Sequence, residues 1–279
     1  IVPWNYPMQI IGRSVGAALA MGNACVLKPA EEACLTALAF GQIALDAGLP
    51  PGALAIVPGL GEEAGAALSA HAGVAHLSFT GSVPVGRLIQ TAAARNTIPV
   101  TLELGGKSPQ IVFADADLDA ALPFLVNAGI QNCGQTCSAG SRILVERPVF
   151  EEVKRRMAER YAALRVGPAL DDLDVGPVIS ARQREIVERY LGIARDTGLQ
   201  VVGQAVLPAT LPAGGCYVPP TLLAPVDPQH RLAQEEIFGP VQVMIPFDGE
   251  AEALAIANGT DYGLVAGVWT RDGGRQLRM

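Results

Sequence analysis

Short apolar runs alternate along the chain with longer stretches in which apolar residues recur at helical spacing. Residues 8–23 have the spacing of an amphipathic helix and end in a Gly-Asn stop signal, and residues 24–29 follow as a short buried strand. The same step then recurs, with helices expected near 32–47, 62–71 and 84–94 and strands at 53–58, 74–81 and 99–104. Strands that alternate with helices in this way predict a doubly wound α/β domain with a parallel sheet.

The glycine pair at 105 and 106 interrupts this pattern and marks an expected domain boundary. Residues 105–279 predict a second α/β domain, with strands at 110–113 and 142–146, helices at 117–132, 149–163 and 180–197, and β-rich segments from 216 to 247. The chain begins without Met and stops within a helix that follows the apolar run 263–270. We therefore expect a piece of a longer protein, cut at both ends.

Composition favours a globular protein that acts on small molecules. Half of the residues are hydrophobic, enough for a large buried core. Acidic residues outnumber basic ones, 27 to 20, for a formal net charge of −7, and the basic residues are scattered. This charge distribution argues against nucleic acid or an anionic membrane as a partner. The apolar runs are also too short to cross a bilayer.

The cysteines argue against a metal site and against a disulfide framework. The five cysteines are odd in number, form no CxxC pair and have no flanking histidines. They are Cys25, Cys34, Cys133, Cys137 and Cys216. We therefore expect no bound metal and a reducing, cytoplasmic location, and no signal for export opens the chain.

Two strand ends carry residues that suit a nucleotide. In "FTGSVPVG" a strand turns into a helix at Gly81 and Ser82, where backbone N–H groups and the helix dipole favour a phosphate, although plain helix capping is the alternative. In "LKPAEE", Lys28 and Glu31 follow a strand at its carboxyl end, the edge where open α/β sheets bind ligands. A solvated loop is the alternative there.

Two other polar residues stand out against their surroundings. Asn5 in "PWNYP" lies between aromatic residues and two prolines, so its amide is either a rigid oxyanion donor or ordinary turn chemistry. Glu103 is a lone acid in an apolar strand directly before two glycines. It is either a general base or an acid that points outward at a strand end.

Cys137 lies in "GQTCSAGS", a segment of small residues between a helix and a strand. Small neighbours allow close approach of a substrate, and backbone N–H groups could activate the thiol without a histidine. A buried structural cysteine is the alternative, which fits Cys133 on the preceding helix better.

In this order, "PWNYP", "KPAEE", "FTGS", "LELGGKSP", "GQTCSAGSR" and "EEIFGPV" closely resemble the NAD(P)-dependent aldehyde dehydrogenase superfamily, over essentially the whole chain. The glutamate and cysteine segments are the most specific of these motifs. The resemblance implies an α/β fold with two domains, truncated at both ends. Residues 1–104 would be the C-terminal portion of a Rossmann-type, parallel-sheet NAD-binding domain, and residues 105–279 an incomplete catalytic thiol domain.

The resemblance also implies a mechanism that oxidises an aldehyde to a carboxylic acid. Cys137 matches the family's nucleophile, which forms a thiohemiacetal and then a thioester. The oxyanion would be held by the Asn5 amide and the backbone N–H of Cys137. Glu103 matches the general base that activates water for hydrolysis of the thioester.

Cofactor residues carry over in the same way. Lys28 and Glu31 match contacts to the adenosine ribose, Gly81 and Ser82 the pyrophosphate turn, and Glu236 and Phe238 the nicotinamide ribose and ring, with Trp4 in the same region. A carboxylate at Glu31 should repel a 2'-phosphate, so NAD is favoured, with NADP as the second candidate.

The substrate expected from the resemblance is a small aldehyde in a pocket that includes Tyr6 and Arg13. Arginine at this position suggests a carboxylate on the substrate, as in an acidic semialdehyde such as succinate semialdehyde, while a surface or interface arginine is the alternative. Ser14 departs from a lysine common in relatives. The resemblance further implies a homodimer or homotetramer.

Two other functional classes stay open. One is a CoA-acylating dehydrogenase, in which coenzyme A takes the acyl group; relatives of that type often lack the glutamate, so Glu103 counts against it. The other is a non-catalytic binding or structural protein on the same fold, which the presence of Cys137, Asn5 and Glu103 disfavours.

Overall fold

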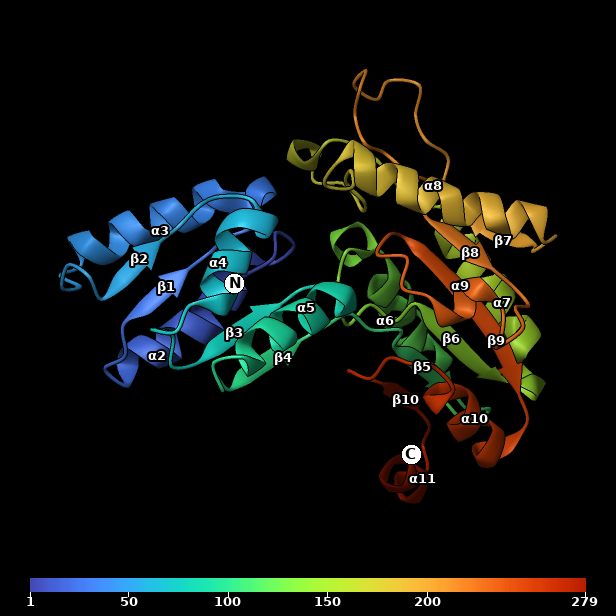
Figure 1. Cartoon of the computed structure of the whole chain (residues 1–279). Coiled ribbons are helices and arrows are strands. Elements are labelled where there is room, and N and C mark those ends of the chain that lie inside the picture. Colours follow the sequence, from blue (N-terminus) through green and yellow to red (C-terminus); the bar gives the residue numbers. More distant parts are fainter. The chain divides into compact units, whose positions relative to one another are not determined.

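Contacts within the chain separate at the glycine pair that interrupts the sequence pattern. The computed structural model describes all 279 residues, in two units: residues 1–105 and residues 106–279. Figure 1 shows the first unit in blue to blue-green and the second in green to red.

Strands and helices alternate through the first unit, as the sequence pattern predicts. Its strands are β1 (Cys25–Leu27), β2 (Leu54–Ile56), β3 (Leu77–Thr80) and β4 (Val100–Glu103). Its helical segments are α1 (Pro7–Ile11), the π-helical turn η1 (Gly12–Gly16), α2 (Ala17–Ala20), the 3₁₀ turn η2 (Glu31–Ala33), α3 (Cys34–Asp46), the π-helical turn η3 (Gly61–Gly65), α4 (Ala66–Ala70) and α5 (Val83–Ala94). The helix expected over 8–23 is thus α1, η1 and α2 in succession.

The strands of the first unit differ from the single sheet that the sequence predicts. They form two parallel pairs, β1 with β2 and β3 with β4. Residues at the start of the chain lie between the pairs: Val2 bridges to Pro29, beyond β1, while the Ile1 amino group donates to the Ser78 carbonyl in β3 at 2.8 Å. β1 and β3 do not pair directly, so the hydrogen-bonded ladder is interrupted between the two strand pairs.

A cavity of about 770 Å³ lies in the first unit between β1 and β3. Its walls include backbone and side chains of both strands, the π-helical turn η1 and part of α4. Polar side chains also line it, among them Arg13, His76 and Glu103. The cavity is therefore lined by apolar residues together with the charged side chains of Arg13 and Glu103.

The second unit contains one six-stranded sheet in the order β10-β5-β6-β9-β8-β7. Its strands are β5 (Pro109–Val112), β6 (Arg142–Glu146), β7 (Val201–Gln204), β8 (Thr221–Leu223), β9 (Val241–Phe247) and β10 (Gly267–Trp269). Its helical segments are α6 (Leu118–Ile130), the 3₁₀ turn η4 (Gln131–Gly134), α7 (Arg147–Ala162), the 3₁₀ turn η5 (Ala169–Asp171), α8 (Ala181–Asp196), α9 (Arg231–Gln234), α10 (Gly249–Asn258) and α11 (Gly273–Arg278).

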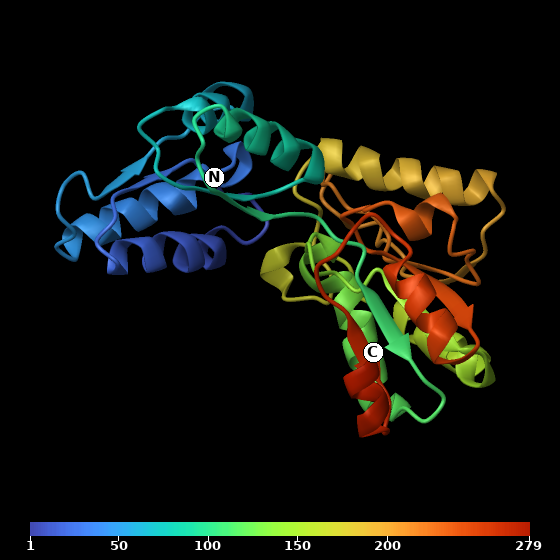
Figure 2. The same ribbon diagram turned by 60° about the horizontal axis from the view of Figure 1, so that its bottom comes forward.

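All neighbouring strands of this sheet are parallel except β7 and β8. The crossover through α6 steps from β5 to its neighbour β6, while the crossover through α10 runs the other way, from β9 to β10. Right-handed crossovers in opposite directions place their helices on opposite faces of a sheet. Figure 2 shows the sheet of the second unit with helices packed around it.

Both faces of the sheet are covered by a large apolar core. The central strands β6 and β9 contribute almost only buried residues, as expected of parallel strands with helices on each side. Phe113, Phe247, Tyr161 and Met157 are among the largest side chains that are fully buried there. This core therefore fixes in place the strands and helices that flank the candidate site residues of the second unit.

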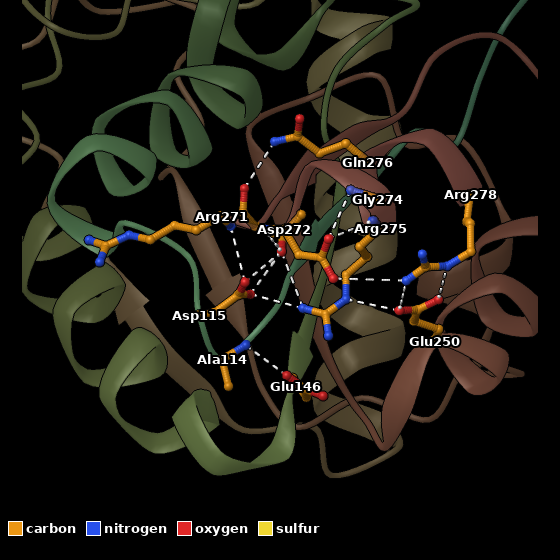
Figure 3. Close-up of polar contacts among 11 residues, drawn as sticks. Ala114, Asp115, Glu146, Glu250, Arg271, Asp272, Gly274, Arg275, Gln276 and Arg278 are labelled. Atoms are coloured by element: carbon orange, nitrogen blue, oxygen red, sulfur yellow. Dashed lines mark hydrogen bonds and ion pairs between the residues drawn. The ribbon is translucent and has the colours of Figure 1, made fainter.

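A network of charged side chains holds α11 against the second unit (Figure 3). Asp115, just after β5, accepts hydrogen bonds from the Thr270 hydroxyl and from Arg275 Nη1, at 2.8 and 2.9 Å. Glu250 in α10 accepts hydrogen bonds from Arg275 Nε at 3.1 Å and Arg278 Nη2 at 2.7 Å. The Arg275 guanidinium also lies 4.2 Å from the ring centroid of Phe113. Arg275 thus links α11 to the segment that follows β5 and to α10.

We expect acid to loosen α11. Hydrogen bonds from Arg278 and Arg275 lower the pKa of Glu250 from 4.5 to about 2. A carboxylate whose pKa is lower in the folded protein stabilises the fold above its unfolded pKa and stops doing so as pH falls toward the folded value. Between about pH 4.5 and 2, the protection factors of the amides in residues 273–278, taken relative to the intrinsic exchange rate at each pH, should therefore fall ahead of those in β6.

Two variants test that assignment. Glu250→Gln should lower the protection factors in residues 273–278 already at neutral pH and flatten their dependence on acid, whereas Glu185→Gln on the exposed surface of α8 should change neither. An acid-induced loss of protection that persists unchanged in Glu250→Gln would assign the effect to another carboxylate.

Candidate active site

In the first unit, Asn5 lies where the N-terminal segment passes the end of β1. The Val2 N–H donates to the Lys28 carbonyl at 3.0 Å, and residues 4–6 then form a bend that leads into α1. Pro7 occupies the first position of that helix, where its fixed φ suits the helical turn. Trp4, Asn5 and Tyr6 are all half-buried. The "PWNYP" and "KPAEE" segments are therefore neighbours in space.

Lys28 and Glu31 form an ion pair at the carboxyl end of β1. Lys28 is buried, 3% exposed, and its Nζ donates to Glu31 Oε1 at 2.9 Å. Partial burial raises the pKa of Glu31, but the hydrogen bond and charge of Lys28 together with backbone N–H donors outweigh it and hold the pKa below its usual range. Glu31 is thus ionised at neutral pH, and its charge offsets that of Lys28.

Gly81 and Ser82 connect β3 to α5. The Gly81 N–H donates to the Glu103 carbonyl at 3.0 Å, and a Cβ at Gly81 would come within 2.5 Å of the Phe79 ring, so a larger residue would not fit without a shift. Ser82 is the N-cap of α5 and makes no side-chain capping bond. The first N–H groups of a helix lack partners within the helix, so this turn can receive an anion.

Glu103 ends β4 directly beside the end of β3. Thr80 and Glu103 are paired in the register of these parallel strands. The Glu103 side chain is 37% exposed and its Oε1 lies 3.2 Å from Arg13 Nη1. Arg13 Nη2 donates to Thr80 Oγ1 at 3.2 Å. The sequence offered Glu103 as a general base or as an acid that points outward, and neither alternative included an arginine partner. In the structure Glu103 is half-exposed and paired with Arg13.

In the second unit, Cys137 occupies a turn between η4 and β6. The Ala139 N–H donates to the Thr136 carbonyl at 3.0 Å, which closes a turn with Cys137 at its second position. The Cys137 side chain is partly exposed. The end of the loop is fixed by Gln242, whose Nε2 donates to the Gly140 carbonyl at 2.6 Å. The thiol therefore lies on a short, anchored loop.

The backbone that enters this loop has left-handed conformation at three consecutive residues. Asn132, Cys133 and Gly134 have φ of 50°, 55° and 71°. Non-glycine residues rarely adopt this conformation, and runs of it occur where surrounding contacts hold them in place. Here a Cβ at Gly134 would collide with the backbone of Gly239 and Pro240, so only glycine allows the "EEIFGPV" segment to pack this closely.

The structure corrects the placement of Cys133. It lies in the 3₁₀ turn η4 rather than on the preceding helix, because α6 ends at Ile130 and the left-handed residues follow. Its side chain is buried in the main core, and burial raises the pKa of its thiol to about 12. An interior thiol of this kind is inert at neutral pH.

Glu236 and Phe238 lie close to the cysteine loop. Glu236 Oε1 accepts a hydrogen bond from the Gly106 N–H at 3.1 Å, and a Cβ at Gly106 would come within 2.6 Å of the Cys137 carbonyl oxygen. Burial raises the pKa of Glu236, against the effects of the Gly106 N–H and of Lys107. Phe238 has a left-handed φ of 56°. The "GGK", "QTCS" and "EEIFG" segments therefore meet at one place.

Two basic residues of this region escaped the sequence analysis. Lys107 is 2% exposed, and burial lowers its pKa to about 7, with a further contribution from the charge of Arg142. Arg142, at the start of β6, is equally buried and donates hydrogen bonds to the carbonyls of Lys107, Ile256 and Ala257 at 2.7 to 2.8 Å. The sequence signal for Arg142 is a base at the start of an apolar strand, and the signal for Lys107 is a base between the glycine pair and the next strand.

The comparisons with known proteins agree on one family. The profile of the Aldehyde dehydrogenase family matches residues 1–279. A betaine aldehyde dehydrogenase from Cereibacter sphaeroides (strain ATCC 17029) is 46% identical over 279 residues, which cover 99% of this chain and 56% of that protein. The chain thus spans a little over half the length of this relative.

Solved structures give the same result. A crystal structure from Burkholderia cenocepacia, assigned as an aldehyde dehydrogenase, has 61% identity and a TM-score of 0.98 over 99% of this chain and 58% of its own. Betaine aldehyde dehydrogenase from Staphylococcus aureus, solved in complex with NAD⁺, has 36% identity and a TM-score of 0.95 over 99% of this chain and 55% of its own. The family resemblance and the α/β fold that it implies are confirmed, and the chain belongs to the aldehyde dehydrogenase family.

Proposed function

We propose that the protein that contains this chain oxidises an aldehyde to a carboxylic acid, with NAD as hydride acceptor and Cys137 as the nucleophile. The observation that carries the proposal is the partly exposed thiol on an anchored turn, beside the Gly106 and Glu236 segments. A cysteine flanked by small residues leaves room for a carbonyl carbon at the sulfur. Membership of the aldehyde dehydrogenase family supports the same chemistry.

The first step is attack of the Cys137 thiolate on the aldehyde carbon. A carbon–sulfur bond forms, and the carbonyl π electrons move to oxygen, which gives a thiohemiacetal oxyanion. We assign stabilisation of that oxyanion to the Asn5 side-chain amide and the backbone N–H of Cys137. Such donors accelerate the step when they are held in place before the charge develops. The bend at residues 4–6 and the turn at 136–139 provide that rigidity.

The residues expected to bind the cofactor fit a dinucleotide. The ionised Glu31 can accept hydrogen bonds from ribose hydroxyls, and its pairing with Lys28 leaves no net positive charge for a 2'-phosphate. The Gly81–Ser82 turn at the start of α5 suits a pyrophosphate. Bound NAD would supply the acceptor for the hydride that leaves the thiohemiacetal carbon. We therefore propose NAD as the cofactor in preference to NADP.

Glu103 is proposed as the base that completes the cycle. Its carboxylate takes a proton from water, the water oxygen bonds to the acyl carbon, and the carbon–sulfur bond breaks with its electrons on Cys137. A CoA-acylating enzyme would not need this base, and a non-catalytic protein would need neither Glu103 nor Cys137. Hydrolysis is therefore the favoured outcome.

The substrate class is proposed separately. Arg13 lines the cavity of the first unit with a side chain that is 51% exposed, which keeps an acidic semialdehyde as a candidate substrate. The Cereibacter and Staphylococcus relatives are named for betaine aldehyde. We further propose a cytoplasmic location, since none of the five cysteines forms a disulfide. A homodimer or homotetramer is proposed from the family resemblance. None of the helices has the length and apolar composition required to cross a membrane.

Rapid mixing with NAD and a panel of aldehydes tests the proposal. Protein expressed from its complete coding sequence should release a burst of NADH of about one equivalent per active site, and intact mass should show a transient acyl adduct on Cys137. The panel includes succinate semialdehyde, betaine aldehyde and a neutral aliphatic aldehyde, and NADP replaces NAD in a parallel set. Binding of NAD without burst or adduct for any aldehyde would reject the dehydrogenase and favour a binding protein.

A further inference from the structure

Arg13 is presented to the end of β4 by an irregular turn of helix. It belongs to η1, the π-helical turn inserted between α1 and α2. A π-helical insertion changes the direction of the side chains it carries, and such turns occur often at functional sites. Arg13 is thereby directed at the edge where β3 and β4 end.

The guanidinium of Arg13 engages both strands at once. Nη1 lies 3.2 Å from Oε1 of Glu103, and Nη2 donates to the hydroxyl of Thr80 at 3.2 Å. Thr80 is 9% exposed and paired with Glu103 in the strand register, so it is a fixed second point of attachment. A planar guanidinium held at two points constrains the direction of its carboxylate partner more than a single ammonium would.

We propose that Arg13 is a positioning residue for Glu103, an inference that rests on the proposed function. The Arg13 contact engages Oε1, so Oε2 is the oxygen assigned to take the proton of the attacking water. Arg13 takes no proton itself, because a guanidinium stays protonated in proteins. Its task is to hold the carboxylate at the end of β4 while the water oxygen bonds to the acyl carbon and the thiolate of Cys137 leaves.

The same contact weakens the alternative, in which Arg13 binds a carboxylate of the substrate. Its positive charge is already paired with Glu103, and a neutralised pair attracts a second anion less than an isolated guanidinium does. A substrate anion would also have to share the arginine with the base. Positioning of Glu103 is therefore the role that the observed contacts favour.

Arg13→Gln and Arg13→Lys test the proposal in the protein expressed from its complete coding sequence. Arg13→Gln should leave the rate and amplitude of the NADH burst within about twofold, because Cys137 still forms the thioester. Steady-state turnover should fall by about 10- to 100-fold, the effect of a displaced general base, and the acyl adduct should accumulate. Arg13→Lys should recover part of the loss, since the charge stays but the second attachment is lost. KM for succinate semialdehyde and for a neutral aldehyde should change in parallel.

Arg87→Gln, on the exposed surface of α5, is the matched control and should leave all of these values unchanged. Thermal unfolding of each variant identifies any loss of fold. Equal loss of burst and steady-state rate in folded Arg13→Gln, unchanged turnover, or a rise in KM confined to the semialdehyde would each overturn the positioning role, the last in favour of substrate binding. Absence of any burst in the unsubstituted protein would instead overturn the proposed function, and the role of Arg13 with it.

Discussion

Cys137→Ala is expected to abolish aldehyde oxidation, with turnover lower by about 10⁴-fold or more. Alanine cannot form the carbon–sulfur bond, and the Thr136–Ala139 turn would keep its backbone because that turn depends on main-chain contacts. Both the NADH burst and the mass adduct should disappear together, while NAD binding, followed by quenching of protein fluorescence, should persist.

Cys216→Ala provides the matched control. Cys216 is also a partly exposed thiol of the second unit, but it lies outside the segments assigned to the site. Its variant should retain burst, adduct and turnover. An adduct that survives in Cys137→Ala, or that maps to Cys216 in the unsubstituted protein, would contradict the assignment of the nucleophile.

Arg142→Met should lower the free energy of unfolding of the second unit by roughly 3–5 kcal/mol. This is the largest loss of stability that we expect from any of the proposed substitutions. The substitution leaves the carbonyls of Lys107, Ile256 and Ala257 without their donor in a buried environment. Burial lowers the pKa of Arg142 to about 10, so the guanidinium remains charged at neutral pH and its hydrogen bonds are charge-assisted. Urea denaturation of the second unit measures the loss.

Arg182→Met, at an exposed position in the first turn of α8, should change stability by less than about 0.5 kcal/mol. Arg142→Lys should fall between the two, because an ammonium keeps the charge but cannot reach three carbonyls in the geometry of a guanidinium. A loss of less than about 1 kcal/mol in Arg142→Met would mean that water or a rearranged backbone satisfies those carbonyls.

The positions of helices and strands could be predicted well because each depends on residues close in sequence. The helix expected at 180–197 is α8, Ala181–Asp196, with Ser180 as its N-cap, and the strand expected at 142–146 is β6 itself. Apolar periodicity and capping residues act over one or two turns, so they are readable in a single sequence. How strands assemble depends on distant partners, which is why two strand pairs replace the single sheet expected in the first unit.

The candidate site divides in the same way. Residue type and strand-end position identified Lys28, Glu31, Gly81, Glu103 and Cys137 as candidates, because chemistry and local turns are properties of short segments. The residues that contact these side chains could not be inferred from the sequence. Glu236 meets Gly106 from 130 positions away, a contact that only the packing of "EEIFGPV" against the left-handed turn at 132–134 creates.

By itself, the sequence determined the alternation of strands and helices, the family resemblance and the chemical types at the site. Only the tertiary structure decided that Arg13 pairs with Glu103 and Thr80, and that Arg142 crosses 114 positions to reach the end of α10. The physical reason is the sequence distance over which each interaction acts. Backbone propensity and apolar spacing act between near neighbours, whereas the partner of a charged side chain is set by whichever distant segment the packed core brings within about 3 Å of it.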